Sequence, residues 1–208
     1  MSDPVAQLRA FWNARYSASH YAYGTEPNDY LARQSRLIPK GGKVLCLADG
    51  EGRNSVYLAR QGFQVTAIDL AQEGLAKGKA LAEKAGVQVQ FMAADVNAFV
   101  IEPGAWQGIV SIFLHLPDKL RRALHERCLK GLSPGGVFIF EAYSREQLGR
   151  GTGGPKEAHL LPEAQSVRDD FPSAAVIDFF AGDRQIEEGP LHNGIGAVVQ
   201  LTATSPAP

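Results

Sequence analysis

The stretch Lys43-Val44-Leu45-Cys46-Leu47-Ala48-Asp49-Gly50-Glu51-Gly52-Arg53-Asn54 decides the fold. Its apolar first half predicts a buried strand, and the two glycines predict a tight turn after it. A helical pattern then begins at Asn54 and stops at Gly62. Gly50 and Gly52 let the backbone approach a ligand closely, and the first N–H groups of a helix lack intrahelical partners. Strand, turn and helix in this order predict a site for a polar or negatively charged ligand.

Two acidic residues follow the next two predicted strands. Asp69 ends the run 64–69, and Asp95 follows the run 88–93 after one alanine. Doubly wound nucleotide sites place a carboxylate after the second strand, where it accepts hydrogen bonds from ribose hydroxyls. An acid after the third strand can reach an adenine amine, with the N–H of Val96 facing a ring nitrogen. We therefore expect both acids beside the glycine turn.

The rest of the chain alternates predicted strands and helices. Strands are expected at 44–48, 64–69, 88–93, 107–113 and 137–142, and helices at 54–61, 71–85, 117–130 and 162–170. Two further helices are expected before them, the first starting at Asp3-Pro4 and the second capped by Asn28. The runs 175–181 and 195–202 predict an antiparallel hairpin. This order predicts an α/β domain with a mostly parallel sheet of seven strands, helices on both faces and one antiparallel strand near the C-terminus.

Composition narrows the class of protein. A length of 208 residues fits one domain, and a net charge of −1 gives no overall attraction to nucleic acid or to an anionic membrane. Cys46 and Cys128 fall in a predicted strand and helix, which indicates buried small hydrophobes and neither a disulfide nor a metal site. The start of the chain has no apolar leader, and no apolar run reaches the roughly 18 residues of a membrane span. We expect a cytoplasmic monomer or homodimer without nucleic-acid or membrane partners.

The glycine turn with its acid suits NAD, FAD or S-adenosylmethionine. The dinucleotide fingerprint G-x-G-x-x-G would need glycines at 48, 50 and 53, where this chain has Ala48, Gly50 and Arg53. Arg53 stands where helix and strand must pack closely, which disfavours a pyrophosphate site. Asp95, and a hairpin in place of a second nucleotide-binding half, favour S-adenosylmethionine.

With these motifs the chain resembles the class I S-adenosylmethionine-dependent methyltransferases over about residues 20–202. The matching motifs are 45–54 for the first, Asp69 for the second, Asp95-Val96 for the third, 110–116 for the fourth and 132–136 for the turn before the fifth strand. Segments 23–28 and 50–54 resemble small bacterial proteins related to tellurite-resistance methyltransferases. Two positions depart from the family, because Cys46 replaces its usual acid and Ala48 its first glycine. Asp49 or Glu51 can substitute for that acid.

The resemblance implies a three-layer Rossmann-like methyltransferase fold in a single domain, 1–208. Residues 1–40 would form an N-terminal helical lid or cap, and 143–172 a substrate-side loop and helix. S-adenosylmethionine would be the cofactor, with S-adenosylhomocysteine as its product. Its expected contacts are Tyr23 from the lead-in, Ala48, Asp49, Gly50 and Gly52 at the methionine end, Asp69 and Leu70 at the ribose, Asp95 and Val96 at the adenine, and Ile112 near the sulfonium.

The resemblance also implies a small-molecule acceptor, methylated by in-line displacement. The acceptor stays open between a metalloid oxyanion or thiol and a quinone or amine metabolite, and S-adenosylmethionine binding without catalysis is a further alternative. His115, just past the fourth strand, is a tentative general base, or it only shapes the pocket. A metalloid oxyanion attacks through a lone pair and needs no base.

Several other side chains carry two interpretations. Trp12, Tyr21 and Tyr23 form either a lid or ordinary core. Arg53 either steers an anionic substrate or makes a surface salt bridge. His192 and Asn193 are interpreted as turn residues. Within the helix 71–85, Glu73 is expected to pair with Lys77. In the helix 117–130 we expect three side chains to face the core: Leu120, Leu124 and Cys128. Its arginines are expected to face mainly the solvent: Arg121, Arg122 and Arg127.

Overall fold

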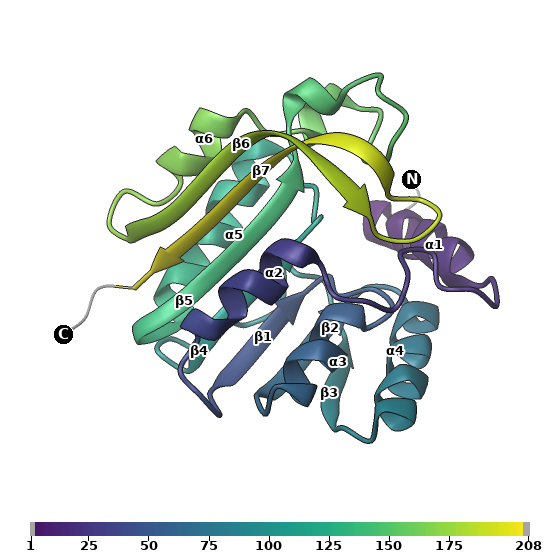
Figure 1. The fold of residues 1–208 in the computed structure, drawn as a ribbon, viewed down its shortest axis with the longest axis horizontal. Coiled ribbons are helices and arrows are strands. Elements are labelled where there is room, and N and C mark those ends of the chain that lie inside the picture. The colour runs from purple at the N-terminus through teal and green to yellow at the C-terminus, as the bar shows by residue number, and fades with distance from the viewer. Residues whose placement is uncertain (1–2, 206–208) are drawn as a thin grey trace.

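The computed structural model describes residues 3–205, which form one seven-stranded sheet in the order β3-β2-β1-β4-β5-β7-β6 (Figure 1). The strands are β1 (Lys43–Leu47), β2 (Gln64–Asp69), β3 (Val89–Ala93), β4 (Trp106–Ile112), β5 (Leu132–Tyr143), β6 (Ala175–Glu187) and β7 (Asn193–Thr204). The first five pair in parallel, and β7 pairs antiparallel with both β5 and β6. Within the described residues β7 alone runs against the other strands, which confirms the predicted topology.

Six α-helices accompany the sheet in the described part of the chain. They are α1 (Pro4–Tyr16), α2 (Asp29–Gln34), α3 (Arg53–Arg60), α4 (Gln72–Ala85), α5 (Asp118–Gly131) and α6 (Ala164–Asp169), with short 3-10 turns at Ser35–Leu37, Arg145–Gln147 and Ala158–Leu160. The first helix starts at Pro4 as predicted, with the N–H of Val5 donating to Asp3, and the predicted cap Asn28 accepts the N–H of Leu31. None of these helices combines the length and apolarity that spanning a bilayer requires.

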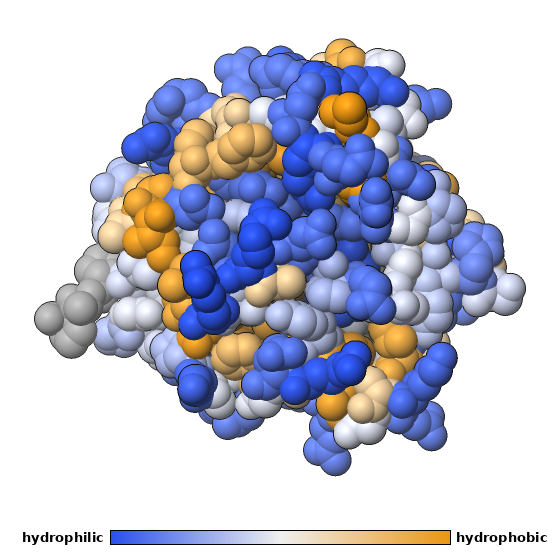
Figure 2. Space-filling view, viewed as in Figure 1, coloured by the Kyte–Doolittle hydropathy of each residue, from blue (hydrophilic) through white to orange (hydrophobic). Residues whose placement is uncertain are grey.

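Two buried clusters sandwich the sheet. On one face Leu124 and Cys128 of α5 pack with Val167 of α6 against β4, β5 and β7. On the other face Leu31 of α2 and Leu58 of α3 pack against β1, β4 and β5. Cys46 and Cys128 are free, buried thiols in these two clusters, as predicted for small hydrophobes. Figure 2 shows apolar side chains also gathered on the surface over β6 and α6.

The predicted burial of α5 is wrong at several positions. Arg121 is buried and its Nε donates to Oδ2 of Asp170 at 2.8 Å, while Leu120 is 42% exposed. Arg127 donates to the backbone oxygen of Val96 at 3.0 Å, and among the three arginines Arg122 is the exposed one. The reason is that the buried carboxylate of Asp170 requires cationic partners, and α5 supplies them from its inner face.

Two glycines let α4 lie directly on the turn after β1. A Cβ on Gly52 would come within 2.6 Å of the Gly78 Cα, and a Cβ on Gly74 within 2.8 Å of the Gly50 oxygen. This close packing explains why α4 tolerates glycines that each cost up to about 1 kcal/mol against alanine. It also fixes the bend 48–52 against β2 and α4.

Candidate cofactor and acceptor site

The carboxyl ends of β1 to β5 meet at one edge of the sheet, and β1 and β4 lie side by side at the point where the strand order reverses. Open α/β sheets bind ligands at such a switch point. The bend 48–52 follows β1 there, with φ of +49° at Ala48, +62° at Gly50 and +87° at Gly52, the N-cap of α3. Left-handed backbone is strained for alanine, so the bend holds Ala48 in an unfavourable conformation at the end of β1.

Asp69 joins this bend to the end of β2. Its Oδ2 accepts the N–H of Gly50 and its Oδ1 that of Ala71, both at 2.8 Å. Burial raises the pKa of Asp69 above its ordinary value, although these backbone bonds oppose the rise. The predicted juxtaposition of Asp69 with the glycine turn is thus present.

Asp95 lies at the neighbouring strand end. The backbone oxygen of Asp69 accepts the N–H of Ala94 at 2.9 Å, which brings the ends of β2 and β3 together. The Asp95 carboxylate accepts the N–H of Asn97 at 2.9 Å and starts a turn. Leu70 is half-buried beside Asp69, and the Val96 side chain packs into the core on the α5 face. The structure therefore gathers the predicted ribose and adenine residues at one edge.

Asp49 is an acid within the bend itself. Its Oδ2 accepts the Ser55 hydroxyl at 2.5 Å, and burial raises its pKa to about 7. Cys46, in the position of the family's acid, is a buried thiol whose pKa burial also raises, so it supplies no charge. Asp49 is consequently a carboxyl of the bend that can change its charge near neutral pH.

Ile112 ends β4, as predicted for the tip of the fourth strand, and Phe113 follows it into the site. Ile112 is buried in the cluster that faces α2 and α3, whereas Phe113 has a φ of +54° and lies in ring contact with Tyr143 and His192, at 4.7 and 4.6 Å between ring centres. A bulky residue with positive φ is a genuine outlier, and such strain concentrates at functional sites. We call the side chains that gather here the aromatic cluster; its members are Tyr23, Phe113, His115, Tyr143 and His192.

His115 holds a defined tautomer in this cluster. Its Nδ1 lies 3.3 Å from the backbone oxygen of Leu160. That oxygen can only accept, so Nδ1 carries the proton and Nε2 of the neutral ring carries a lone pair. Nε2 is buried without a hydrogen-bond partner in the described structure, and burial lowers the pKa of His115 to about 4. The ring is therefore neutral above about pH 5, with an acceptor nitrogen available.

His192 lies in the turn between β6 and β7, as predicted, but its side chain is buried in the aromatic cluster. Its Nδ1 also lacks a partner in the described structure, and burial lowers its pKa well below the ordinary value. The loop 149–155 closes over it, because a Cβ on Gly153 would meet the Tyr143 hydroxyl at 2.4 Å and the His192 ring at 2.8 Å. Sequence reasoning missed Tyr143, although it directly follows the predicted strand 137–142 and is the last residue of β5.

The connection between α1 and α2 lies over the bend. Lys77 pairs with Glu51, not with Glu73 as predicted, and its Nζ donates to the backbone oxygens of Ala18 and His20 at 2.9 and 2.6 Å. Glu51 in turn accepts the N–H of Ala22 at 2.7 Å. Figure 1 shows α1 beside α4, on the side of this connection. That residues 1–40 act as a lid stays a prediction.

The side chains of Tyr16, at the end of α1, and Tyr23, in the connection, face the site. A Cβ on Gly50 would lie 2.8 Å from the Tyr16 hydroxyl, so this ring rests on the bend. The Tyr23 ring lies 4.4 Å from that of His192. Trp12 stacks on Tyr16 at 5.6 Å, whereas the Tyr21 hydroxyl donates to the backbone oxygen of Lys77 outside the aromatic cluster.

Both interpretations of Arg53 are wrong. Arg53 is only 7% exposed and donates to Glu188 at 2.5 Å, so it is neither a free steering cation nor a surface ion pair. Arg184 donates to Glu141 at 2.6 Å and to Glu188 at 2.5 Å, and the Asn28 amide donates to both glutamates. This buried network ties the cap of α2 and the start of α3 to the turn that carries His192.

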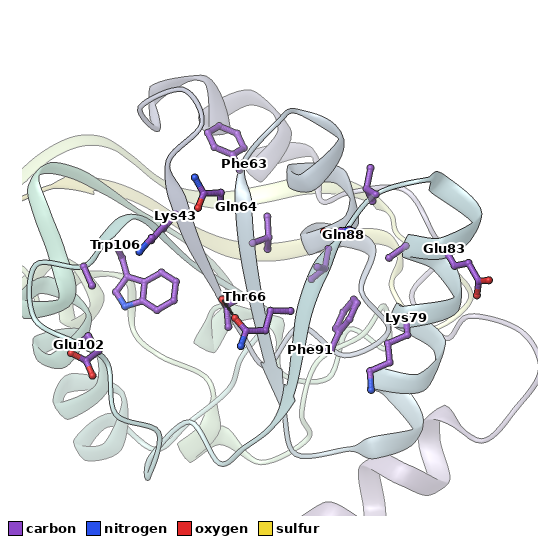
Figure 3. Close-up of a pocket in the computed structure, with 16 residues that line it drawn as sticks. Lys43, Phe63, Gln64, Thr66, Lys79, Glu83, Gln88, Phe91, Glu102 and Trp106 are labelled. Atoms are coloured by element: carbon purple, nitrogen blue, oxygen red, sulfur yellow. Dashed lines mark hydrogen bonds between the residues drawn. The ribbon is translucent and has the colours of Figure 1, made fainter.

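A cavity of about 910 Å³ lies elsewhere, at the amino ends of β1, β2 and β4 (Figure 3). Lys43, Gln64 and Trp106 start those strands and line it, together with Lys79 and Glu83 of α4. None of the predicted site residues lines this cavity. It is therefore separate from the edge that holds the bend and the aromatic cluster.

Comparison with known proteins finds similarity to methyltransferases in both sequence and fold. A family described as "Methyltransferase domain" matches residues 44–136. A ubiquinone biosynthesis O-methyltransferase of Xanthomonas campestris pv. campestris is 32% identical over 149 residues, covering 69% of this chain and 61% of the relative. The chain thus spans about three fifths of that relative's length. TehB from Haemophilus influenzae is similar in fold, with a TM-score of 0.71 at 17% identity over 95% of this chain and 66% of TehB. A structure titled for the conversion of a disulfide into a thioacetal in echinomycin biosynthesis has a TM-score of 0.78 at 15% identity, covering 98% and 92% of the two chains.

Proposed function

We propose that the chain is a class I S-adenosylmethionine-dependent methyltransferase that transfers a methyl group to the hydroxyl or thiol of a small molecule. The observation that carries this proposal is the unpartnered Nε2 of His115 inside the buried aromatic cluster. A neutral imidazole whose lone pair has no hydrogen-bond partner suits an acceptor that must lose a proton. The known relatives named for O-methyl transfer agree with such an acceptor.

The residues at the bend fit S-adenosylmethionine, which supplies an electrophilic methyl group on its sulfonium. Each Asp69 oxygen takes one backbone N–H, and a carboxylate oxygen can accept two hydrogen bonds, so capacity remains for ribose hydroxyls. Asp95 and Val96 at the end of β3 would hold the adenine. Tyr23 and the backbone of 48–52, with Asp49, would hold the methionine end.

The chain's own residues would position the nucleophile, exclude water from it and accept its proton. Holding the nucleophile in line with the methyl group can supply roughly 7–11 kcal/mol of the barrier. The rings of Phe113, Tyr143 and His192 exclude water from the acceptor. The proton of the acceptor's hydroxyl or thiol would pass to Nε2 of His115, and such a proton transfer typically contributes a factor of about 10²–10⁴.

Among hydroxyl acceptors, the names of the curated relatives favour a phenolic precursor of a quinone. A metalloid oxyanion would use the same pocket through a lone pair, without His115 as base. Binding of S-adenosylmethionine without transfer would leave the acceptor pocket idle.

The test is formation of S-adenosylhomocysteine with a panel of thiols, catechols, amines, selenite and tellurite. We expect turnover with a thiol or a catechol, and a fall in kcat of about 10²–10⁴ in His115→Gln with affinity for S-adenosylhomocysteine unchanged. Turnover with tellurite or selenite alone, at equal rates in both proteins, would replace our proposal with the oxyanion. Tight S-adenosylmethionine binding without any product would favour the binding protein.

A further inference from the structure

Four cationic side chains surround the site. Within the described residues three have carboxylate partners: Arg53 pairs with Glu188, Arg184 with Glu141 and Glu188, and Lys77 with Glu51. Arg15, in the last turn of α1, forms no ion pair among residues 3–205. We propose that Arg15 binds the negatively charged group of a small molecule in the site, a carboxylate or an oxyanion. This inference rests on the proposed function, because it concerns ligands of the same site.

Neutral contacts hold the Arg15 guanidinium in place. It is half-buried, and its Nη1 donates to the Tyr23 hydroxyl at 3.3 Å. Its central carbon lies 5.1 Å from the Phe11 ring centre and 5.9 Å from that of Trp12. These rings orient the cation through their π faces but leave its charge uncompensated. A guanidinium offers five N–H donors in a planar fork, which suits a carboxylate or an oxyanion.

Arg15 also lies between the two halves of the site. Tyr23, its hydrogen-bond partner, is in ring contact with His192 of the aromatic cluster. Tyr16, the next residue, rests on Gly50 in the bend. Arg15 further lowers the pKa of buried His192, a smaller cause than burial itself, so its charge is felt inside the cluster. The anion can therefore be the methionine carboxylate of the cofactor or a negative group on the acceptor.

The experiment measures equilibrium binding and does not need turnover. Arg15→Gln removes the charge and can still donate to Tyr23, whereas Arg15→Lys keeps the charge. Arg9→Gln, at an exposed position of the same helix, is the matched control. One arm compares S-adenosylhomocysteine with 5′-methylthioadenosine, which shares the adenosyl group but has no carboxylate. The other compares 4-hydroxybenzoate with its methyl ester, each added to the protein saturated with S-adenosylhomocysteine.

If the anion is the cofactor's carboxylate, Arg15→Gln weakens S-adenosylhomocysteine about tenfold to a hundredfold and leaves 5′-methylthioadenosine unchanged. If the anion belongs to the acceptor, the same variant weakens 4-hydroxybenzoate relative to its ester. In either case Arg15→Lys loses less affinity than Arg15→Gln, and Arg9→Gln binds each ligand as the wild type does. The proposal is overturned if Arg15→Gln changes neither ratio. Failure of the proposed transfer would appear instead as absent turnover in the wild type, with these binding ratios intact.

Discussion

The N–H of Gly50 donates to Oδ2 of Asp69 at 2.8 Å, so the bend after β1 and the acid after β2 form one unit. A carboxylate in this position has two tasks. It fixes the loop that would cradle the cofactor, and its remaining lone pairs would bind the ribose. Loss of Asp69 should therefore affect folding and binding together.

We predict that Asp69→Ala weakens S-adenosylhomocysteine binding by about 1.5–3 kcal/mol, because a charged hydrogen-bond acceptor is lost. The N–H groups of Gly50 and Ala71 lose their partner as well, which should lower the free energy of unfolding by about 1–3 kcal/mol. Titration calorimetry and urea unfolding measure the two effects. Asp95→Ala is the comparison for the unfolding measurement, since within the fold its carboxylate bonds only Asn97 of its own turn. Unchanged affinity in Asp69→Ala would discredit the ribose assignment.

Asp49 should make stability depend on pH. Its folded-state pKa of about 7 lies above the ordinary 3.8, because burial disfavours the charge. The folded protein then binds the proton more tightly than the unfolded chain, so this contribution to stability is full below about pH 4 and is lost as pH rises to 7. Asp49→Asn should remove that loss. Relative to wild type, the variant should gain up to roughly 4 kcal/mol between pH 4 and pH 8, at about 1.4 kcal/mol per pKa unit.

Thermal unfolding of both proteins between pH 4 and pH 8 checks this prediction. The difference in Tm should grow with pH in favour of Asp49→Asn. Ser55→Ala serves as the control, because it removes the hydroxyl that bonds Asp49 but leaves the titrating carboxyl in place. A Tm difference independent of pH would show that Asp49 does not titrate in this range.

The sheet and half of the site could be predicted because their signals are local. Gly50, Asp69 and Asp95 each follow an apolar run, and the parallel order of the strands brings their ends to one edge. Arg121 could not be placed in this way, because its burial depends on Asp170, which lies far along the chain, directly after α6. His192 reaches the site from a hairpin turn, and the loop 149–155 that covers it has no periodicity. Only the folded chain shows these contacts.

Gly78 should be indispensable for the packing of α4. A Cβ there would lie 2.7 Å from the Phe91 ring and 3.3 Å from the Gly52 Cα. Gly78→Ala should therefore destabilise the protein by about 1–3 kcal/mol, although alanine favours a helix by about 1 kcal/mol. Displacement of Gly52 should also weaken S-adenosylhomocysteine binding. Urea unfolding and calorimetry test both effects, with Ala76→Gly on the exposed face as a control for helix propensity alone. A stabilised Gly78→Ala protein would contradict the packing argument.

The ion pair between Arg53 and Glu188 should be strongly coupled, since both side chains are buried. Arg53→Met removes a guanidinium and leaves the Glu188 carboxylate with Arg184 and the Asn28 amide as its remaining partners. Breaking one side of a buried pair typically costs about 3–5 kcal/mol, and the remaining partners should keep the loss near the lower figure.

In the double variant Arg53→Met with Glu188→Gln, the uncompensated charge disappears. We therefore expect urea unfolding of the four proteins to give a double variant more stable than Arg53→Met alone, with a coupling energy above about 1 kcal/mol. Additive losses would mean that the network does not act as a unit, and the turn that carries His192 would then owe its position to the close contact between Gly189 and Gly24.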